Sequence, residues 1–182
     1  MLKSIMMKNV KLLQKSVFQT LIQDNVNYNL WANETMVNWL QEHSSDKFIR
    51  EIPSSFKSIF ETLEHIFKVQ DFWLKMIQNK PYEPTEDEFS VEELFEKIIR
   101  NSIELRDFVC DLDEFELQEK MEISTPWFTS HQPRYELIQQ IITHGTYHRG
   151  QIVTIGRNVG ISNASNTDFN FYLLRGKEMS VM

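Results

Sequence analysis

The chain has 182 residues, of which 41% are hydrophobic and 25% charged, so it is long and apolar enough to bury a core without covalent staples. The net charge of −7 argues against a nucleic-acid-binding protein, because an acidic surface repels phosphate backbones. The single cysteine, Cys110, excludes an internal disulfide and a multi-cysteine zinc site. We find no run of 18 apolar residues and no signal peptide, and therefore expect a cytoplasmic protein without a membrane span, folded as a single domain over residues 1–182.

Two amphipathic helices are predicted in the first half of the chain. The first covers residues 12–42, and its apolar seam, at spacings of three and four, is imperfect. Its members are Val17, Leu21, Asp24, Tyr28, Trp31 and Thr35. The second helix begins at a capping box formed by Ser58 and Glu61 and ends before Pro81 and Pro84. One face of it carries Ile59, Leu63, Ile66, Gln70, Trp73 and Ile77.

Two further helices are predicted in the second half, separated by a short strand or hairpin in residues 120–131. The third helix begins at a second capping box, Ser90 with Glu93, and fades at residues 113–114. Its seam is Val91, Leu94, Ile98, Ser102, Leu105, Val109 and Leu112. The fourth begins near Pro133, a good first-turn residue, and stops at Gly160. Its seam is Ile138, Ile141, Gly145, His148, Ile152, Ile155 and Val159.

Four long amphipathic helices predict an all-α fold, a four-helix bundle. Connections of roughly ten residues leave both simple up-and-down and up-down-down-up order open. Gly145 and Gly150 lower the stability of the fourth helix, which predicts close packing at both positions. The tail, residues 166–175, is apolar enough to dock back on the bundle.

Histidines are the residues most indicative of chemistry. His144 and His148 are four positions apart, which places both imidazoles on one helix face, where they can bind one metal ion together. His65 lies at the edge of the apolar arc of the second helix and supplies a candidate third ligand from a facing helix. Three imidazoles leave coordination positions open for water and substrate. The alternative is that these are core histidines bonded to backbone carbonyls.

Other candidate residues fit structural roles at least as well. His43 lies at a helix C-terminus and His131 in a loop, and both are read as structural or solvated. Cys110 lies off the main seam of its helix and is read as a packing residue.

Residues beside the histidine pair suggest supporting roles. Arg149 is expected either to contact a carboxylate or thiol substrate, or to cap or salt-bridge a neighbouring helix. Gln151 is placed to orient an imidazole. Asn29 and Asn33, on the first helix, are expected to pack or hydrogen-bond inside the bundle.

A sequence block on the fourth helix resembles the signature of a known family. The block His144-Gly145-Thr146-Tyr147-His148-Arg149-Gly150-Gln151 is similar to that of the DinB/YfiT-like family of candidate metalloenzymes. The resemblance covers residues 13–175 and includes segments 28–33, 55–59, 62–66 and 167–173.

This resemblance implies a four-helix bundle in up-down-down-up order, a homodimer, and one divalent metal held by His65, His144 and His148. All three positions at which the resemblance implies a ligand carry histidine in this sequence. The family includes thiol-dependent S-transferases and a mycothiol-dependent isomerase, and many of its members have no assigned activity.

Two functions follow from these observations. The first is a metal-dependent enzyme, a transferase using a low-molecular-weight thiol or a hydrolase, that acts on a small molecule with a thiol or water as nucleophile. The second is a non-catalytic stress-related or interaction protein with a structural metal. All-imidazole ligation favours zinc or nickel and also admits iron, copper or manganese.

Overall fold

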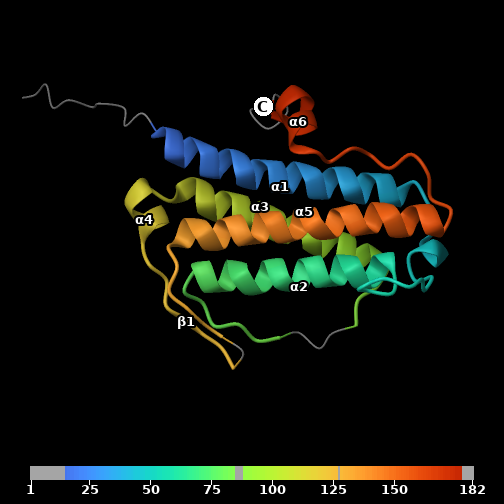
Figure 1. Cartoon of the computed structure of the whole chain (residues 1–182), viewed down its shortest axis with the longest axis horizontal. Coiled ribbons are helices and arrows are strands. Elements are labelled where there is room, and N and C mark those ends of the chain that lie inside the picture. Colours follow the sequence, from blue (N-terminus) through green and yellow to red (C-terminus); the bar gives the residue numbers. More distant parts are fainter. Residues whose placement is uncertain (1–14, 85–87, 127, 178–182) are drawn as a thin grey trace, which may run out of the picture.

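Four long helices packed side by side form the body of the protein (Figure 1). The computed structural model describes residues 15–84, 88–126 and 128–177. The long helices are α1 (Val17–Gln41), α2 (Ile59–Ile77), α3 (Val91–Asp111) and α5 (Arg134–Asn158). The short elements are η1 (Ser45–Lys47), α4 (Glu114–Gln118), β1 (Ile123–Ser124), β2 (Thr129–Ser130), α6 (Phe169–Phe171) and the π-helical η2 (Tyr172–Gly176). The predicted all-α class is confirmed.

The helices α1 and α5 run in one direction, and α2 and α3 in the other (Figure 1). Helix α1 packs against α3 and α5, and α2 packs against α5 and α3. Of the connection from α2 to α3, residues 78–84 and 88–90 lie along the bundle, and α3 begins at the end opposite to that where α2 ends (Figure 1). No helix among the described residues is both long and apolar enough to cross a membrane.

Side-chain caps set the starts of α2 and α3. The predicted box at α3 is confirmed, since the Ser90 hydroxyl accepts from the Glu93 N–H and the Glu93 carboxylate accepts from the Ser90 N–H. At α2 only half of the predicted box forms. The Ser58 hydroxyl accepts from the Glu61 N–H, but the Glu61 carboxylate accepts from the Lys57 N–H instead. An exposed carboxylate can satisfy either of two adjacent orphan donors, so the start of the helix is unaffected.

The predicted seam of α1 is wrong at its N-terminal end, where Val17 is 88% and Leu21 is 54% exposed. The line of α1 that faces the interior is instead Ile22, Val26, Asn29, Asn33, Met36 and Leu40. Two asparagines interrupt the apolar period of this line, just as Asp24 and Thr35 interrupt the predicted one, so the sequence pattern does not distinguish the two lines. The predicted positions Leu12 and Leu13 lie outside the described residues.

The connection from α3 to α5 contains more structure than the sequence predicts. After α3 ends, the Asp113 side chain caps the short helix α4 by accepting from the Glu116 N–H. The predicted hairpin follows, with Ile123 opposite Ser130 in an antiparallel pair. Pro133 is the N-cap of α5, one position earlier than the first-turn position expected for it.

The C-terminal end of α5 has the geometry predicted from Gly160. Its φ is +79°, in the left-handed region that favours glycine. The Gly160 N–H donates to the Arg157 carbonyl and the Ile161 N–H to the Gly156 carbonyl, which together form a Schellman motif.

The tail docks on α1, as predicted. The Tyr172 side chain is 1% exposed, and its ring lies 5.8 Å from the rings of both Tyr28 and Trp31. The Lys177 ammonium group forms an ion pair with the Asp24 carboxylate of α1. The tail therefore covers the Tyr28 side of α1, which accounts for the apolar residues on that line.

The apolar core divides into two clusters along the bundle axis. The buried apolar residues of one cluster fall within residues 22–32 of α1, 74–77 of α2, 105–109 of α3 and 137–142 of α5. Those of the other fall within residues 36–40 of α1, 59–67 of α2, 94–98 of α3 and 152–155 of α5. Between these stretches, the helices carry buried polar residues. The histidines of the predicted metal site lie at or near this level.

The three glycines of α5 have different surroundings. A Cβ at Gly145 would lie 3.0 Å from an Arg149 guanidinium nitrogen, and one at Gly156 would lie 2.9 Å from the Trp39 ring. At Gly150, apart from its chain neighbours and the nearby backbone of α5 itself, no described atom would lie within 4 Å of a Cβ. The predicted close packing is therefore confirmed at Gly145 and wrong at Gly150, which faces open space.

These surroundings predict opposite effects of alanine on stability. Gly150→Ala is expected to raise the free energy of unfolding by about 0.5–1 kcal/mol, because alanine favours helix and meets no neighbour. Gly156→Ala is expected to lower it by about 1–3 kcal/mol, because the methyl group overlaps a buried indole. Urea denaturation of both variants measures the difference, and shifts of the same sign would contradict this prediction.

Candidate metal centre

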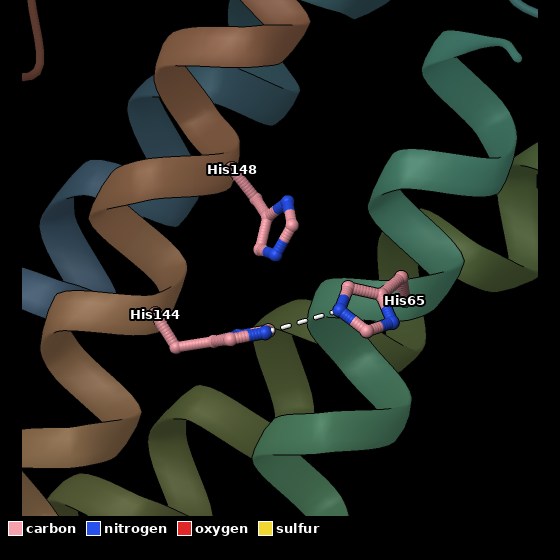
Figure 2. A group of neighbouring side chains, drawn as sticks. All are labelled: His65, His144 and His148. Atoms are coloured by element: carbon pink, nitrogen blue, oxygen red, sulfur yellow. Dashed lines mark hydrogen bonds between the residues drawn. The ribbon is translucent and has the colours of Figure 1, made fainter. Parts of the chain in front are cut away.

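Three histidines from two helices converge between α2 and α5. His65 comes from α2, and His144 and His148 from successive turns of α5 (Figure 2). The Nε2 atoms of His65 and His144 are 3.0 Å apart, and one ring nitrogen of each histidine lies within 4.8 Å of the others. Within the described residues, this group contains no cysteine and no carboxylate. The cluster thus offers three imidazole nitrogens to one point.

The orientation of His148 is fixed by its neighbour on α5. The Oε1 atom of Gln151 lies 2.7 Å from the Nδ1 atom of His148. An amide oxygen can only accept, so Nδ1 carries the proton and the lone pair of Nε2 is free to bind a metal. The role predicted for Gln151, orienting an imidazole, is confirmed by this contact.

Aromatic side chains that the sequence analysis did not single out line the cluster. The Phe56 ring stacks on His65 at a centroid distance of 4.2 Å and meets the edge of His148 at 5.5 Å. Tyr147 contacts the same His148 ring from within α5. A possible signal for Phe56 was its position two residues before Ser58, the N-cap of the helix that carries His65.

Burial keeps the imidazoles of His65 and His144 neutral at physiological pH. Burial, followed by the nearby His148 and His65 rings, lowers the pKa of His144 to about 4. Burial and the His148 ring also lower the pKa of His65. Neutral imidazole is the form that binds metals, and one cation would satisfy three converging nitrogen lone pairs at once. The donor set therefore fits a divalent metal ion.

Comparison with known proteins identifies the family of this chain. The family model described as "DinB family" matches residues 8–177. The chain belongs to the DinB family. Protein DinB of Bacillus subtilis (strain 168) is 30% identical over 162 residues, which cover 82% of this chain and 92% of that protein. Uncharacterized protein YizA of the same strain is 27% identical over 141 residues, or 76% of this chain and 87% of that protein.

The other candidate residues of this DinB family member lie outside the cluster. The His43 ring packs against Trp39, and His131 is exposed beside Glu122. Cys110 is half-buried on α3, and burial raises the pKa of its thiol, so little thiolate exists at neutral pH. These positions agree with the structural or solvated roles expected from the sequence.

Arg149 points into the bundle and is only 1% exposed. Its guanidinium donates to the side-chain oxygens of Asn29, Asn33, Tyr28 and Thr146, all of which are neutral. The contacts of Asn29 and Asn33 inside the bundle agree with the sequence prediction. A direct contact between Arg149 and a substrate would require the guanidinium to leave these partners.

A cavity of about 300 Å³ opens beside the cluster in this DinB family member. Tyr147 and Gln151, both in contact with His148, line this cavity together with Ser54, which precedes α2. No charged side chain lines this cavity. The cavity therefore adjoins the histidine cluster through Tyr147 and Gln151.

The lowered pKa of His144 predicts that acid destabilises the metal-free protein. Between pH 6.5 and about 4, His144 binds a proton in the unfolded chain but stays neutral in the folded protein. The free energy of unfolding should therefore fall as the pH falls through this window, and His65 acts in the same direction. Urea denaturation across this range measures the slope, which His144→Gln should make shallower. An unchanged slope in His144→Gln would contradict the prediction.

Proposed function

We propose that this protein is a metal-dependent enzyme in which His65, His144 and His148 hold one divalent ion. The observation that carries the proposal is the convergence of three imidazole nitrogens within 4.8 Å of one another. Three neutral ligands do not complete the coordination of a divalent metal, and catalytic sites keep such open positions. A single-domain chain acting on a small-molecule substrate is part of the same proposal.

When bound, the ion supplies Lewis acidity, which makes water or an external thiol acidic enough to react near neutral pH. The residues of the chain hold and shield this centre. Gln151 keeps the proton of His148 on Nδ1, while Phe56 and Tyr147 cover the imidazole rings. Because Cys110 is half-buried and its pKa is raised, the nucleophile comes from outside the chain.

The proposal extends to the reaction class and the ligands. Thiol transfer to a small electrophile and hydrolysis both use a nucleophile of this kind, with a low-molecular-weight thiol as cosubstrate in the first case. The cavity beside Gln151 has no charged lining, which favours a neutral substrate. Zinc or nickel suits three imidazoles best, followed by iron, copper or manganese. We also propose that the protein is a homodimer located in the cytoplasm.

The first test is elemental analysis of the tag-free protein beside a His65→Ala, His144→Ala, His148→Ala triple variant. We expect about one divalent ion per wild-type chain and none in the variant, with helical content retained in both. The loaded protein is then assayed for thiol transfer and ester hydrolysis. Absence of metal after reconstitution refutes the metal site, and full occupancy without any activity refutes the enzymatic function.

One observation favours a second function, a non-catalytic protein with a structural metal. Phe56 stacks directly on His65 and also contacts His148, so one side of the cluster is closed. Titration of cobalt-substituted protein with azide, imidazole or thiols separates the two functions. An open catalytic site changes its absorption spectrum on binding, whereas a closed structural site does not.

A further inference from the structure

Arg149 is a buried cation without a carboxylate among its hydrogen-bond partners. Four of its five N–H groups reach neutral oxygens, and Nε is buried with no partner among the described residues. Fully buried arginines are rare unless an anion pairs with them. Such an arrangement lowers the stability of a bundle relative to an apolar layer, and so it calls for a functional reason.

The contacts of Arg149 continue as one chain of hydrogen bonds through all four long helices. Asn29 of α1 accepts from Arg149 and donates to Gln70 of α2. Gln70 donates to Asn101 of α3, and Asn101 donates to the Asp71 carboxylate. Every donor points away from the cation and toward the anion. The amides thus polarise one another, and the hydrogen bonds connect the Arg149 guanidinium to the Asp71 carboxylate at the edge of the bundle.

A second branch of hydrogen bonds belongs to the same network, and together the two branches form a buried polar layer across the bundle. Asn33 of α1 accepts from Arg149 and donates to Ser102 of α3, which also accepts from Gln70. Asn29, Asn33, Gln70 and Ser102 are all 3% exposed or less. A rotation or slide of any one helix would leave several of these groups buried without partners, which is costly. The layer therefore fixes the register of the four helices.

Residues of this polar layer are adjacent in sequence to the histidines of the cluster or lie on the same helix. Arg149 follows His148 directly, and its guanidinium reaches back along α5 to Thr146, between the two histidines of that helix. Gly145 follows His144, and its missing side chain leaves the space that the guanidinium occupies. Gln70 lies on the same helix as His65. Both helices that carry ligands are therefore held by the same buried layer.

We propose that Arg149 is the positioning residue of the metal centre: its guanidinium, fixed to α1, holds the turn between His144 and His148 in the rotation that aims both at His65. The inference rests on the proposed metal site. Hydrogen bonds that orient metal ligands from outside the coordination sphere contribute about 10–100-fold to metal affinity. Arg149 likewise does not bind the metal itself and acts on the ligands through the backbone of α5.

The test compares Arg149→Met with Arg134→Met in the full-length protein. Arg134 is a matched control, because it is also a buried arginine of α5 that bridges to other elements, through the Ile77 carbonyl and Glu119, but it does not belong to the layer. Gly145→Ala is a second probe. It leaves every hydrogen-bonding group in place and sets a methyl group 3.0 Å from the guanidinium nitrogen.

Two measurements are made on each variant: Co²⁺ affinity with its absorption spectrum, and the crystal structure of the metal-free protein. We expect Arg149→Met and Gly145→Ala to bind Co²⁺ about 10–100-fold more weakly, with an altered spectrum. We also expect their His65 and His144 Nε2 atoms to lie farther apart than 3.0 Å. Arg134→Met should lose thermal stability but keep the wild-type affinity, spectrum and ring distance.

Each outcome decides the proposal. Wild-type affinity and ring geometry in Arg149→Met would overturn it, as would an equal loss of affinity in Arg134→Met. If Arg149→Met does not fold, Gly145→Ala and Arg149→Lys decide by the same measurements. If the wild-type protein binds no metal, the proposed function fails, while the ring distance in the metal-free crystals still shows whether Arg149 positions the histidines.

Discussion

Replacing His144 by alanine is expected to lower the affinity of the protein for Zn²⁺ by more than about 100-fold, the upper range for loss of an outer-shell partner. A direct ligand contributes more than an outer partner does, and His144 lies 3.0 Å from the facing His65 nitrogen. The fold should persist, because the His144 side chain is only partly buried. Competition with a chromophoric chelator at neutral pH measures the affinity.

Two further variants serve as comparisons for the loss of Zn²⁺ affinity in His144→Ala. Gln151→Ala removes the acceptor of the His148 Nδ1 proton and should lower the affinity by the smaller factor of about 10–100. His131→Ala removes a histidine whose side chain is 69% exposed, and should leave the affinity unchanged. If His144→Ala and His131→Ala bind Zn²⁺ equally well, the cluster is not the binding site.

Replacing Tyr172 by alanine is expected to lower the free energy of unfolding by about 3–5 kcal/mol, the range for removing a buried aromatic ring. The Tyr172 side chain is 1% exposed and lies against Tyr28, Trp31 and Phe169. Its loss removes apolar burial and leaves a cavity between the tail and α1. Urea denaturation followed by circular dichroism measures the change.

The control for Tyr172→Ala comes from the same tail. Leu174 is 65% exposed, so Leu174→Ala should change the free energy of unfolding by no more than about 0.5 kcal/mol. Equal effects of the two substitutions would mean that the tail contributes little to stability. A large effect of Tyr172→Ala alone would show that the tail is an integral part of the fold.

Local signals predicted the helices because those signals act within a few residues. The Ser90 cap and the left-handed Gly160 depend on neighbouring backbone groups, and the seams of α2, α3 and α5 follow from the 3.6-residue period of a helix. The histidine spacing on α5 is of the same kind, because one helix turn places His144 and His148 together whatever surrounds them. These features could be predicted from the sequence for that reason.

The seam of α1 could not be predicted in the same way. Asn29 and Asn33 look like surface residues in sequence, yet they are 0% and 1% exposed. They are buried only because other helices supply hydrogen-bonding partners. Gln70 and Ser102, which interrupt the seams of α2 and α3, were visible signs of this layer, but their partners lie on other helices.

The sequence by itself determined the four long helices, the Ser58 and Ser90 caps, the family signature and the three histidines as candidate ligands. The tertiary structure alone decided that His65 reaches His144, that Phe56 covers the cluster and that Arg149 faces α1 rather than solvent. The reason is physical. A helix and its caps form from contacts a few residues apart, whereas the partners of a buried polar group are set by the packing of helices distant in sequence.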